Sequence, residues 1–315
     1  MVYRAVSEGS ECLTKNAAGL PFESLPCLYP KLGETYTGFE LSYNPVPVRD
    51  FMVAHPEVPI VACILYLNFI LVGRSYMNDK KPRSWRNALA GWNLLLSVFS
   101  VCGFARVFPH LVHNWREYGM RDCLCNDPEN MYGSGPTGLW VQLFVLSKFP
   151  ELLDTFFIVI HKKPLILLHW YHHFTVLLYC WHSYVHKAPA GIFFVTMNYA
   201  VHGIMYGYYF LMAVKAKPRW MNAKFITIAQ ISQMVVGVGV TMASFYYYMK
   251  EEENDGGGGG KGGDPCLIRK ENNVAAFVMY GSYLFLFLQF FVGRYLKGKA
   301  RKSIESKVEA NKKAD

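Results

Sequence analysis

The stretch that decides the fold runs from Leu165 to Val185 and reads LILLHWYHHFTVLLYCWHSYV. It is apolar and long enough to cross a bilayer as one helix, which takes about 20 residues. His169, His172 and His173 follow an i, i+3, i+4 spacing, which places the three imidazoles on one face of that helix. Polar groups at membrane depth are costly and normally face a protein interior or a water-filled cavity. The stretch therefore predicts a membrane-spanning helix with a functional histidine face.

The rest of the chain has the composition of a polytopic membrane protein. Of its 315 residues, 52% are hydrophobic and only 17% are charged. Seven apolar spans are expected, approximately at 59–77, 88–108, 138–160, 165–185, 190–212, 224–248 and 274–296. We therefore predict an all-α protein with seven transmembrane helices over 59–296. A mixed segment over 1–58 precedes them, and a basic tail over 297–315 follows.

The distribution of lysine and arginine predicts the orientation. One set of loops is richer in basic residues and belongs in the cytoplasm; it includes Lys80, Lys81, Arg83, Arg86, Lys162, Lys163, Lys215, Lys217 and Arg219. An odd number of spans then puts the N-terminus in the lumen and the tail in the cytosol. The tail ends in Lys312-Lys313-Ala314-Asp315, which resembles the dilysine signal of the endoplasmic reticulum. Topology thus accounts for the net charge of +9 without a nucleic-acid partner.

Cysteine and glycine patterns exclude several kinds of site. No CxxC or Cys/His zinc spacing occurs, so no metal site is predicted, and no GxGxxG supports a nicotinamide cofactor. Cys123 and Cys125 lie in one expected lumenal loop and Cys266 in another, so either of the first two is a candidate disulfide partner of the third. The glycine-rich run 256–263 predicts a linker. Cys180, inside an apolar span, is expected to be an inert buried thiol.

Other spans carry polar groups at the depth of the three histidines. The third span offers Lys148, Glu151, Asp154 and Thr155, the fifth Asn198, His202 and Tyr206, and the sixth Gln230 and Gln233. At about 1.5 Å per helical residue, nearly all of them fall in the cytosolic half of the membrane. Carboxylates beside imidazoles fix tautomers and prepare a base or nucleophile. The alternative is that these groups only satisfy one another and hold the helices together.

Two further histidine pairs lie toward the lumenal side. His110 and His113 form one pair and His182 and His186 the other. We expect both to be interfacial or loop histidines outside the site.

Taken together, the polar motifs resemble those of the fatty-acid elongase (ELO) family. The HWYHH stretch at 169–173 matches its HxxHH box, and residues 148–155 match KxxExxDT. Asn198 and His202 match NxxxH, followed by a MYxYY element over 205–209, and a QxxQ-like element follows at 230–233. Four motifs occur in the family's order, whereas the long glycine-rich loop departs from its pattern.

The resemblance implies a 3-ketoacyl-CoA synthase of the endoplasmic reticulum. Such an enzyme condenses an acyl-CoA with malonyl-CoA and releases CO2 and CoA, with no cofactor besides these substrates. Trp170 in the histidine box resembles the branch that elongates saturated and monounsaturated chains of the palmitate class. Family membership further implies six helices in a barrel around a closed-ended acyl tunnel, with the seventh outside. The implied partners are the ketoacyl reductase, dehydratase and enoyl reductase of the cycle. Membrane lipid is a further expected partner, and the oligomeric state stays open, with a homodimer as one candidate.

The chemistry of the residues fits that reaction. Acyl transfer needs a nucleophile, and we expect His172 to act as one, with His202 opposite as acid/base or polariser. Hydrogen-bond donors that stabilise the enolate are expected from His169, His173 and Asn198. Glu151 and Asp154 are expected to orient imidazoles. The expected substrate-binding residues are Lys148, Thr155, Tyr206, Tyr209, Gln230 and Gln233, with Lys215, Lys217 and Arg219 on the CoA phosphates.

Two other classes of protein compete with this interpretation. A membrane di-iron desaturase or hydroxylase also uses HxxHH boxes, but it needs about eight histidine ligands at one face. Here His169, His172, His173 and His202 share one depth, with His161 nearby, and bound iron would decide the question. A transporter with intramembrane charges is the second alternative, although neither inverted repeats nor a pair of broken helices is visible.

Overall fold

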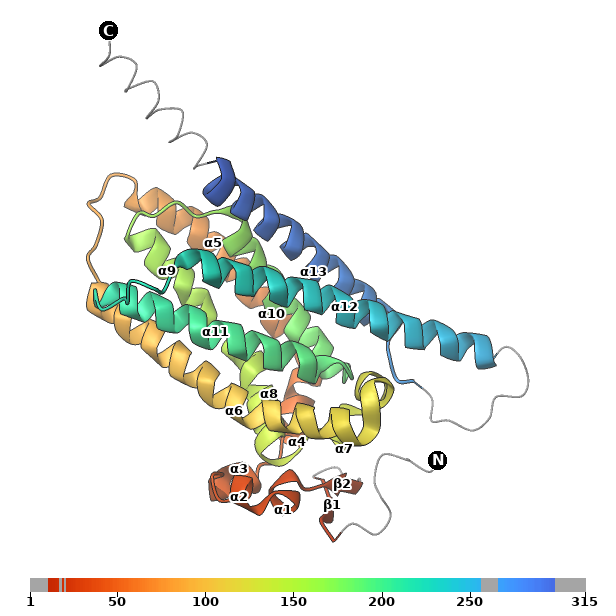
Figure 1. The fold of residues 1–315 in the computed structure, drawn as a ribbon. Helices are drawn as coiled ribbons and strands as arrows, with labels where there is room; N and C mark the ends of the chain where they lie inside the picture. The colour runs from red at the N-terminus through yellow and green to blue at the C-terminus, as the bar shows by residue number, and fades with distance from the viewer. Residues whose placement is uncertain (1–10, 17–18, 20, 256–265, 298–315) are drawn as a thin grey trace, which may run out of the picture.

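The structure of the protein is a computed structural model that describes residues 11–16, 19, 21–255 and 266–297 (Figure 1). It is nearly all-α, with one small two-stranded sheet. The elements in chain order are β1 (Leu13–Lys15), β2 (Pro21–Glu23), α1 (Leu25–Leu28), α2 (Pro30–Gly33), α3 (Gly38–Leu41), α4 (Val46–Ala54), α5 (Glu57–Met77), α6 (Arg86–Cys125), α7 (Pro128–Met131), α8 (Gly135–Ser147), the 3₁₀ turn η1 (Pro150–Leu152), α9 (Leu153–Ile160), α10 (Leu167–Val185), α11 (Gly191–Ala213), α12 (Ala223–Asp255), α13 (Lys270–Phe291) and the π-helical turn η2 (Val292–Lys297). The glycine-rich run 256–263 and the dilysine ending lie outside the described residues.

The long helices form one bundle, with the N-terminal segment packed against one end (Figure 1). Within the described residues, four helices are long and apolar enough to cross a membrane, namely Glu57–Met77, Arg86–Cys125, Ala223–Glu251 and Lys270–Leu296. The other expected spans are helical where the sequence placed them, in α8–α9, α10 and α11. α8 and α9 have 13 and 8 residues and are each too short to cross a membrane alone, whereas α10 and α11 are long enough but carry polar residues that lower their hydropathy. The chain therefore has the helices of a polytopic membrane protein, and the count of seven spans stays a prediction.

Two expected spans have different bounds in the structure. The span expected over 138–160 is not one continuous helix, because Pro150 lacks the N–H that an α-helix needs at that point, and α8 and α9 meet at η1. The span expected over 88–108 continues to Cys125 in α6. Gly119 within it has φ 78°, a left-handed value that favours glycine, so α6 is two helices joined at a kink.

The pair α6 and α11 sets the position of one side of the site. A Cβ at Gly103 in α6 would lie 2.3 Å from Cζ of Tyr199 in α11, so only glycine leaves room for this ring. Tyr199 is 2% exposed, and its hydroxyl donates to the Trp140 carbonyl oxygen in α8 at 2.8 Å. This packing fixes the register of α11, which carries Asn198 and His202.

The N-terminal segment is folded and covers the end of the bundle where α6 ends. A disulfide joins Cys12 to Cys27 around the β1–β2 pair. Glu40 anchors α3, because its carboxylate accepts hydrogen bonds from Arg106 Nε in α6 and Trp140 Nε1 in α8, both at 2.8 Å. Burial raises the pKa of Glu40, but hydrogen bonds from Arg106, the Thr37 backbone and Trp140 together lower it by more, so that its pKa falls to about 2. The sequence alone predicted neither the disulfide nor this anchor.

His110 and His113 lie between α6 and the N-terminal segment, so the expectation that they are loop or membrane-interface histidines was wrong. Both are buried on α6. His110 Nδ1 lies 2.8 Å from the Thr137 hydroxyl oxygen, and His113 Nδ1 lies 3.2 Å from that of Tyr29. The pair is buried because α6 extends beyond its expected end and the N-terminal segment packs on the extension.

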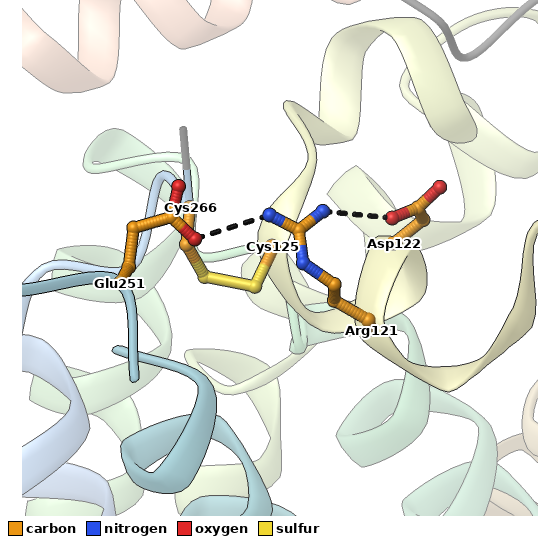
Figure 2. Close-up of a disulfide and its surroundings, with 5 residues drawn as sticks. All are labelled: Arg121, Asp122, Cys125, Glu251 and Cys266. Carbon is orange, nitrogen blue, oxygen red and sulfur yellow. Dashed lines mark hydrogen bonds and ion pairs between the residues drawn. A yellow bond between two sulfur atoms is a disulfide. The ribbon is translucent and has the colours of Figure 1, made fainter. Parts of the chain in front are cut away.

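A second disulfide joins Cys125 at the end of α6 to Cys266 just before α13, which confirms one of the two pairings that the sequence left open. Cys123 is a free and buried thiol. Figure 2 shows Arg121 beside this disulfide, with its guanidinium 3.1 Å from Asp122 Oδ1 and 3.1 Å from Glu251 Oε2 in α12. An ion pair thereby joins the end of α6 to α12, and a disulfide joins it to the segment just before α13.

Candidate functional site

A cavity of about 810 Å³ lies among α6, α9, α10, α11, α12 and α13. Its lining includes ten of the residues that the sequence singled out, which are Asp154, His169, His172, His173, Asn198, His202, Tyr206, Tyr209, Gln230 and Gln233. The tertiary fold thus gathers side chains from four separate sequence motifs around one space.

The three histidines of α10 lie close together on one face, as their spacing predicts. The ring centroids of His169 and His173 are 4.5 Å apart, and those of His172 and His173 are 5.3 Å apart. His172 also lies beside the Tyr283 ring of α13, at 5.0 Å between centroids. Within the described residues, neither nitrogen of the His172 imidazole has a hydrogen-bond partner, and the residue lines the cavity.

His202 is held by a chain of hydrogen bonds that begins at the η1 break. Lys148 Nζ donates to Glu151 Oε1 at 2.7 Å and to Asn198 Oδ1 at 3.3 Å. An ammonium can only donate, so the Asn198 oxygen must face Lys148 and its NH2 group must face His202. The distance from Asn198 Nδ2 to His202 Nε2 is 3.1 Å. Nε2 of His202 therefore accepts, and a neutral His202 carries its proton on Nδ1.

Asp154 forms a second polar group in the cavity wall. Its Oδ1 accepts from Trp92 Nε1 of α6 at 2.7 Å, and its Oδ2 accepts from the Tyr206 hydroxyl at 2.6 Å. His173 Nε2 lies 3.9 Å from the same Oδ2. Of the two carboxylates expected to orient imidazoles, Asp154 therefore lies beside one, whereas Glu151 contacts Lys148 and the Ser147 hydroxyl.

Several predicted site residues do not line the cavity. Lys148, Glu151 and Thr155 are buried behind it, at 2%, 3% and 0% exposure. Lys215, Lys217 and Arg219 lie in the connection between α11 and α12, and none of them belongs to the lining. Lys217 Nζ donates to the carbonyl oxygens of its own loop, at Pro218 and Met221.

Other lining residues were not assigned to the site from the sequence. They include Ser84, Arg86, Asn93 and Lys163, all close to the end of the bundle where α6 begins. Arg86 and Lys163 had been attributed to topology alone, so the sequence signal existed but favoured another explanation. Trp92 and Tyr66, which reach the site through Asp154 and Thr155, carry no sequence signal that distinguishes them from apolar span residues. Within the residues that the structure describes, no group of three or more His, Cys, Asp or Glu side chains gathers to hold a metal ion.

Comparison with known proteins decides the family. The model of the ELO family, described as the GNS1/SUR4 family, matches residues 51–303. The chain belongs to the ELO family. The match spans the whole helical bundle and all four motifs, so it favours the elongase interpretation over the desaturase and transporter alternatives.

Individual relatives of this ELO protein cover most of its length. It is 36% identical over 297 residues to fatty acid elongase 3 of Trypanosoma brucei brucei, and this alignment covers 86% of this chain and 95% of the relative. It is 39% identical over 265 residues to very long chain fatty acid elongase 6 of Drosophila melanogaster, and the alignment covers 84% of this chain and 80% of the relative. The human protein of the same name is 37% identical over 268 residues, and the alignment covers 85% of this chain and 95% of the relative.

Proposed function

We propose that this ELO protein is a 3-ketoacyl-CoA synthase that condenses a long-chain acyl-CoA of the palmitate class with malonyl-CoA. The products are a 3-ketoacyl-CoA two carbons longer, CO2 and CoA. Family membership supports fatty-acid elongation, and the similar fly and human proteins are named very long chain fatty acid elongase 6. Trp170 in the histidine box supports the substrate class.

The observation that carries the proposal is the contrast between His172 and His202 in one cavity. His172 offers both ring nitrogens, whereas Nε2 of His202 is occupied by Asn198. A nitrogen of neutral His172 attacks the thioester carbonyl, the C–S bond breaks, and the imidazole proton goes to the departing CoA sulfur. The result is an acyl-imidazole and free CoA.

In the second half of the reaction, malonyl-CoA loses CO2 and becomes an enolate. Its carbon attacks the acyl carbon, the C–N bond to His172 breaks, and the imidazole takes up a proton from solvent. Hydrogen-bond donors aimed at the enolate oxygen lower this barrier. The N–H of His202, on Nδ1, is one such donor, because Asn198 occupies the other nitrogen.

The cavity and the charges near it support the two substrates. Arg86 and Lys163 line it at the end where α6 begins, which suits CoA phosphates. We retain Lys215, Lys217 and Arg219 as further phosphate contacts on a neighbouring loop. A smaller cavity of about 90 Å³ lies farther along α10 and α11, and its lining includes Val141, Phe144, Val195 and Cys180. We propose that a six-helix barrel encloses the acyl chain, that the chain extends from the histidines toward this smaller cavity, and that α5 is the seventh span outside the barrel.

The proposed setting is the endoplasmic reticulum membrane, with the N-terminus lumenal and the tail cytosolic. Both disulfides support this orientation, because Cys12–Cys27 and Cys125–Cys266 belong to the end of the bundle away from Arg86 and Lys163. Disulfides form in the lumen and are rare in the cytosol. The reductases and dehydratase of the elongation cycle, and a homodimer, remain proposed partners.

The experiment that tests the proposal is the intact mass of the purified protein after incubation with palmitoyl-CoA alone. We expect an acyl adduct on the wild type and none on His172→Ala. Added malonyl-CoA should discharge the adduct as the 3-ketoacyl-CoA. Product formation without any adduct would remove His172 as the nucleophile, and the absence of product with both substrates would overturn the synthase itself.

A further inference from the structure

Tyr66, on the helix that we place outside the barrel, is linked to the catalytic histidines through one intermediate. It is 3% exposed, and its hydroxyl oxygen lies 2.8 Å from Thr155 Oγ1 in α9. The same Oγ1 lies 3.0 Å from His169 Nε2 in α10. Three side chains from three helices therefore form one continuous chain of hydrogen bonds that ends on a cavity-lining imidazole.

Only one arrangement of protons satisfies this chain. If Tyr66 donates to Thr155 and Thr155 donates to His169 Nε2, every hydroxyl proton has an acceptor. If Nε2 of His169 donated instead, one of the two hydroxyl protons would have no acceptor among the described residues. Tyr66 and Thr155 are 3% and 0% exposed, so water cannot replace the missing partner, and an unmade buried hydrogen bond is costly.

We propose that Thr155, whose hydroxyl oxygen accepts from Tyr66, is a positioning residue that keeps the proton of neutral His169 on Nδ1. Nε2 then accepts from Thr155, and no described residue bonds to Nδ1. His169 consequently presents an N–H donor to the cavity and has no lone pair left to act as a base or nucleophile. What this donor does, namely bind the enolate oxygen, rests on the proposed function; the tautomer itself does not.

The direct test of the tautomer is the ¹⁵N NMR spectrum of the full-length protein labelled at histidine. The His169 signals are assigned by their loss in His169→Gln. In the wild type we expect a protonated Nδ1 and an unprotonated, hydrogen-bonded Nε2. In Thr155→Val no hydroxyl donates to Nε2, so part of the His169 population should shift its proton to Nε2. In Tyr66→Phe the Thr155 proton still has Nε2 as its acceptor, so Nδ1 should stay protonated. A wild-type His169 protonated at Nε2, or an unchanged spectrum in Thr155→Val, would overturn the proposal.

The kinetic test separates positioning from general loosening of the bundle. Because the missing hydroxyl acts on a transition-state donor, Thr155→Val, which has the same shape without the hydroxyl, should lower kcat by about tenfold and leave KM within about twofold. Tyr66→Phe, which leaves the Thr155 donor in place, should lower kcat by less. The double variant should be no worse than Thr155→Val alone, since both changes break one chain. Thr155→Ser should restore wild-type kcat.

The matched control is Cys63→Ala, one turn earlier on α5. Cys63 is 2% exposed and its thiol contacts the Phe174 carbonyl oxygen of α10 at 3.6 Å, so it joins α5 to the helix of His169 without touching the chain to His169. We expect it to leave kcat unchanged. Equal losses in Cys63→Ala and Thr155→Val, or additive losses in the double variant, would show that these residues contribute packing alone. A wild type without synthase activity would overturn the proposed function but leave the NMR test of the tautomer intact.

Discussion

Two sets of buried histidines in this protein use the same residue type and helical spacing for different purposes. His169, His172 and His173 on α10 line a cavity of about 810 Å³. His110 and His113 on α6, also spaced by one turn, are 3% and 8% exposed where the N-terminal segment meets the bundle. Each of the α6 pair has a hydroxyl partner, on Thr137 and Tyr29.

The difference lies in what faces each imidazole. In the α6 pair, protein elements that are distant in sequence pack directly on the rings and leave them a structural role. In the α10 group, His172 lines the cavity, and neither of its ring nitrogens has a hydrogen-bond partner among the described residues. Helical spacing places histidines on one face of a helix. Whether that face forms a packed interface or lines a cavity depends on the elements that lie opposite it.

The largest expected effect separates the two sets directly. His172→Ala should lower the rate of condensation by at least about a thousandfold, because it removes the proposed nucleophile. His113→Ala should leave kcat within about twofold and lower the free energy of unfolding by about 1–3 kcal/mol, the cost of a broken buried hydrogen bond. Steady-state kinetics and thermal unfolding of both variants measure this. Comparable kcat losses in the two variants would erase the distinction.

Next in size is the covalent tie at the end of the bundle away from Arg86. Cys125→Ser should lower the free energy of unfolding by about 2–4 kcal/mol, because the disulfide to Cys266 closes a loop of 141 residues. Activity per folded molecule should stay near wild type, since neither cysteine lines the large cavity. Cys123→Ser, two residues away and free, is the control for a change of residue at this place. Differential scanning fluorimetry with and without reductant would test it, and an effect of Cys123→Ser as large as that of Cys125→Ser would argue against the pairing.

A smaller effect is expected at the cavity wall. Trp92→Phe keeps the ring but removes the N–H that donates to Asp154 Oδ1, leaving Tyr206 as the remaining donor to that carboxylate. We expect kcat to fall by about tenfold, the scale of one hydrogen bond to a charged group. The folded structure should persist, as judged by circular dichroism. Unchanged kcat would mean that the orientation of Asp154 is irrelevant to the chemistry.

The smallest effect concerns pH at the N-terminal segment. Folding holds the pKa of Glu40 at about 2, below its ordinary value of 4.5. A lowered pKa stabilises the fold above pH 4.5, and this contribution is lost as pH falls from 4.5 toward 2. Wild type should therefore exceed Glu40→Gln in unfolding temperature at neutral pH, with the gap narrowing as the pH falls through that range. A gap that is the same at both ends of the range would contradict the role of this carboxylate.

The sequence alone determined the helical membrane class, the placement of most long helices and four motifs whose residues the structure places around one cavity. It could do so because apolar length and the 3.6-residue period are local properties of the chain. It also narrowed the disulfide partner of Cys266 to two cysteines.

Only the tertiary structure decided which polar residues meet. Lys148 and Glu151 turned out to lie behind the cavity, Arg86 and Lys163 in its wall, and Tyr66 at the far end of a chain to His169. The burial of His110 and His113 depends on the N-terminal segment, and no periodic pattern in the sequence predicted the fold of that segment. Contacts between helices depend on rotation, depth and the small gaps that residues such as Gly103 leave. These are set by the packing of side chains from distant parts of the chain, which no local pattern encodes.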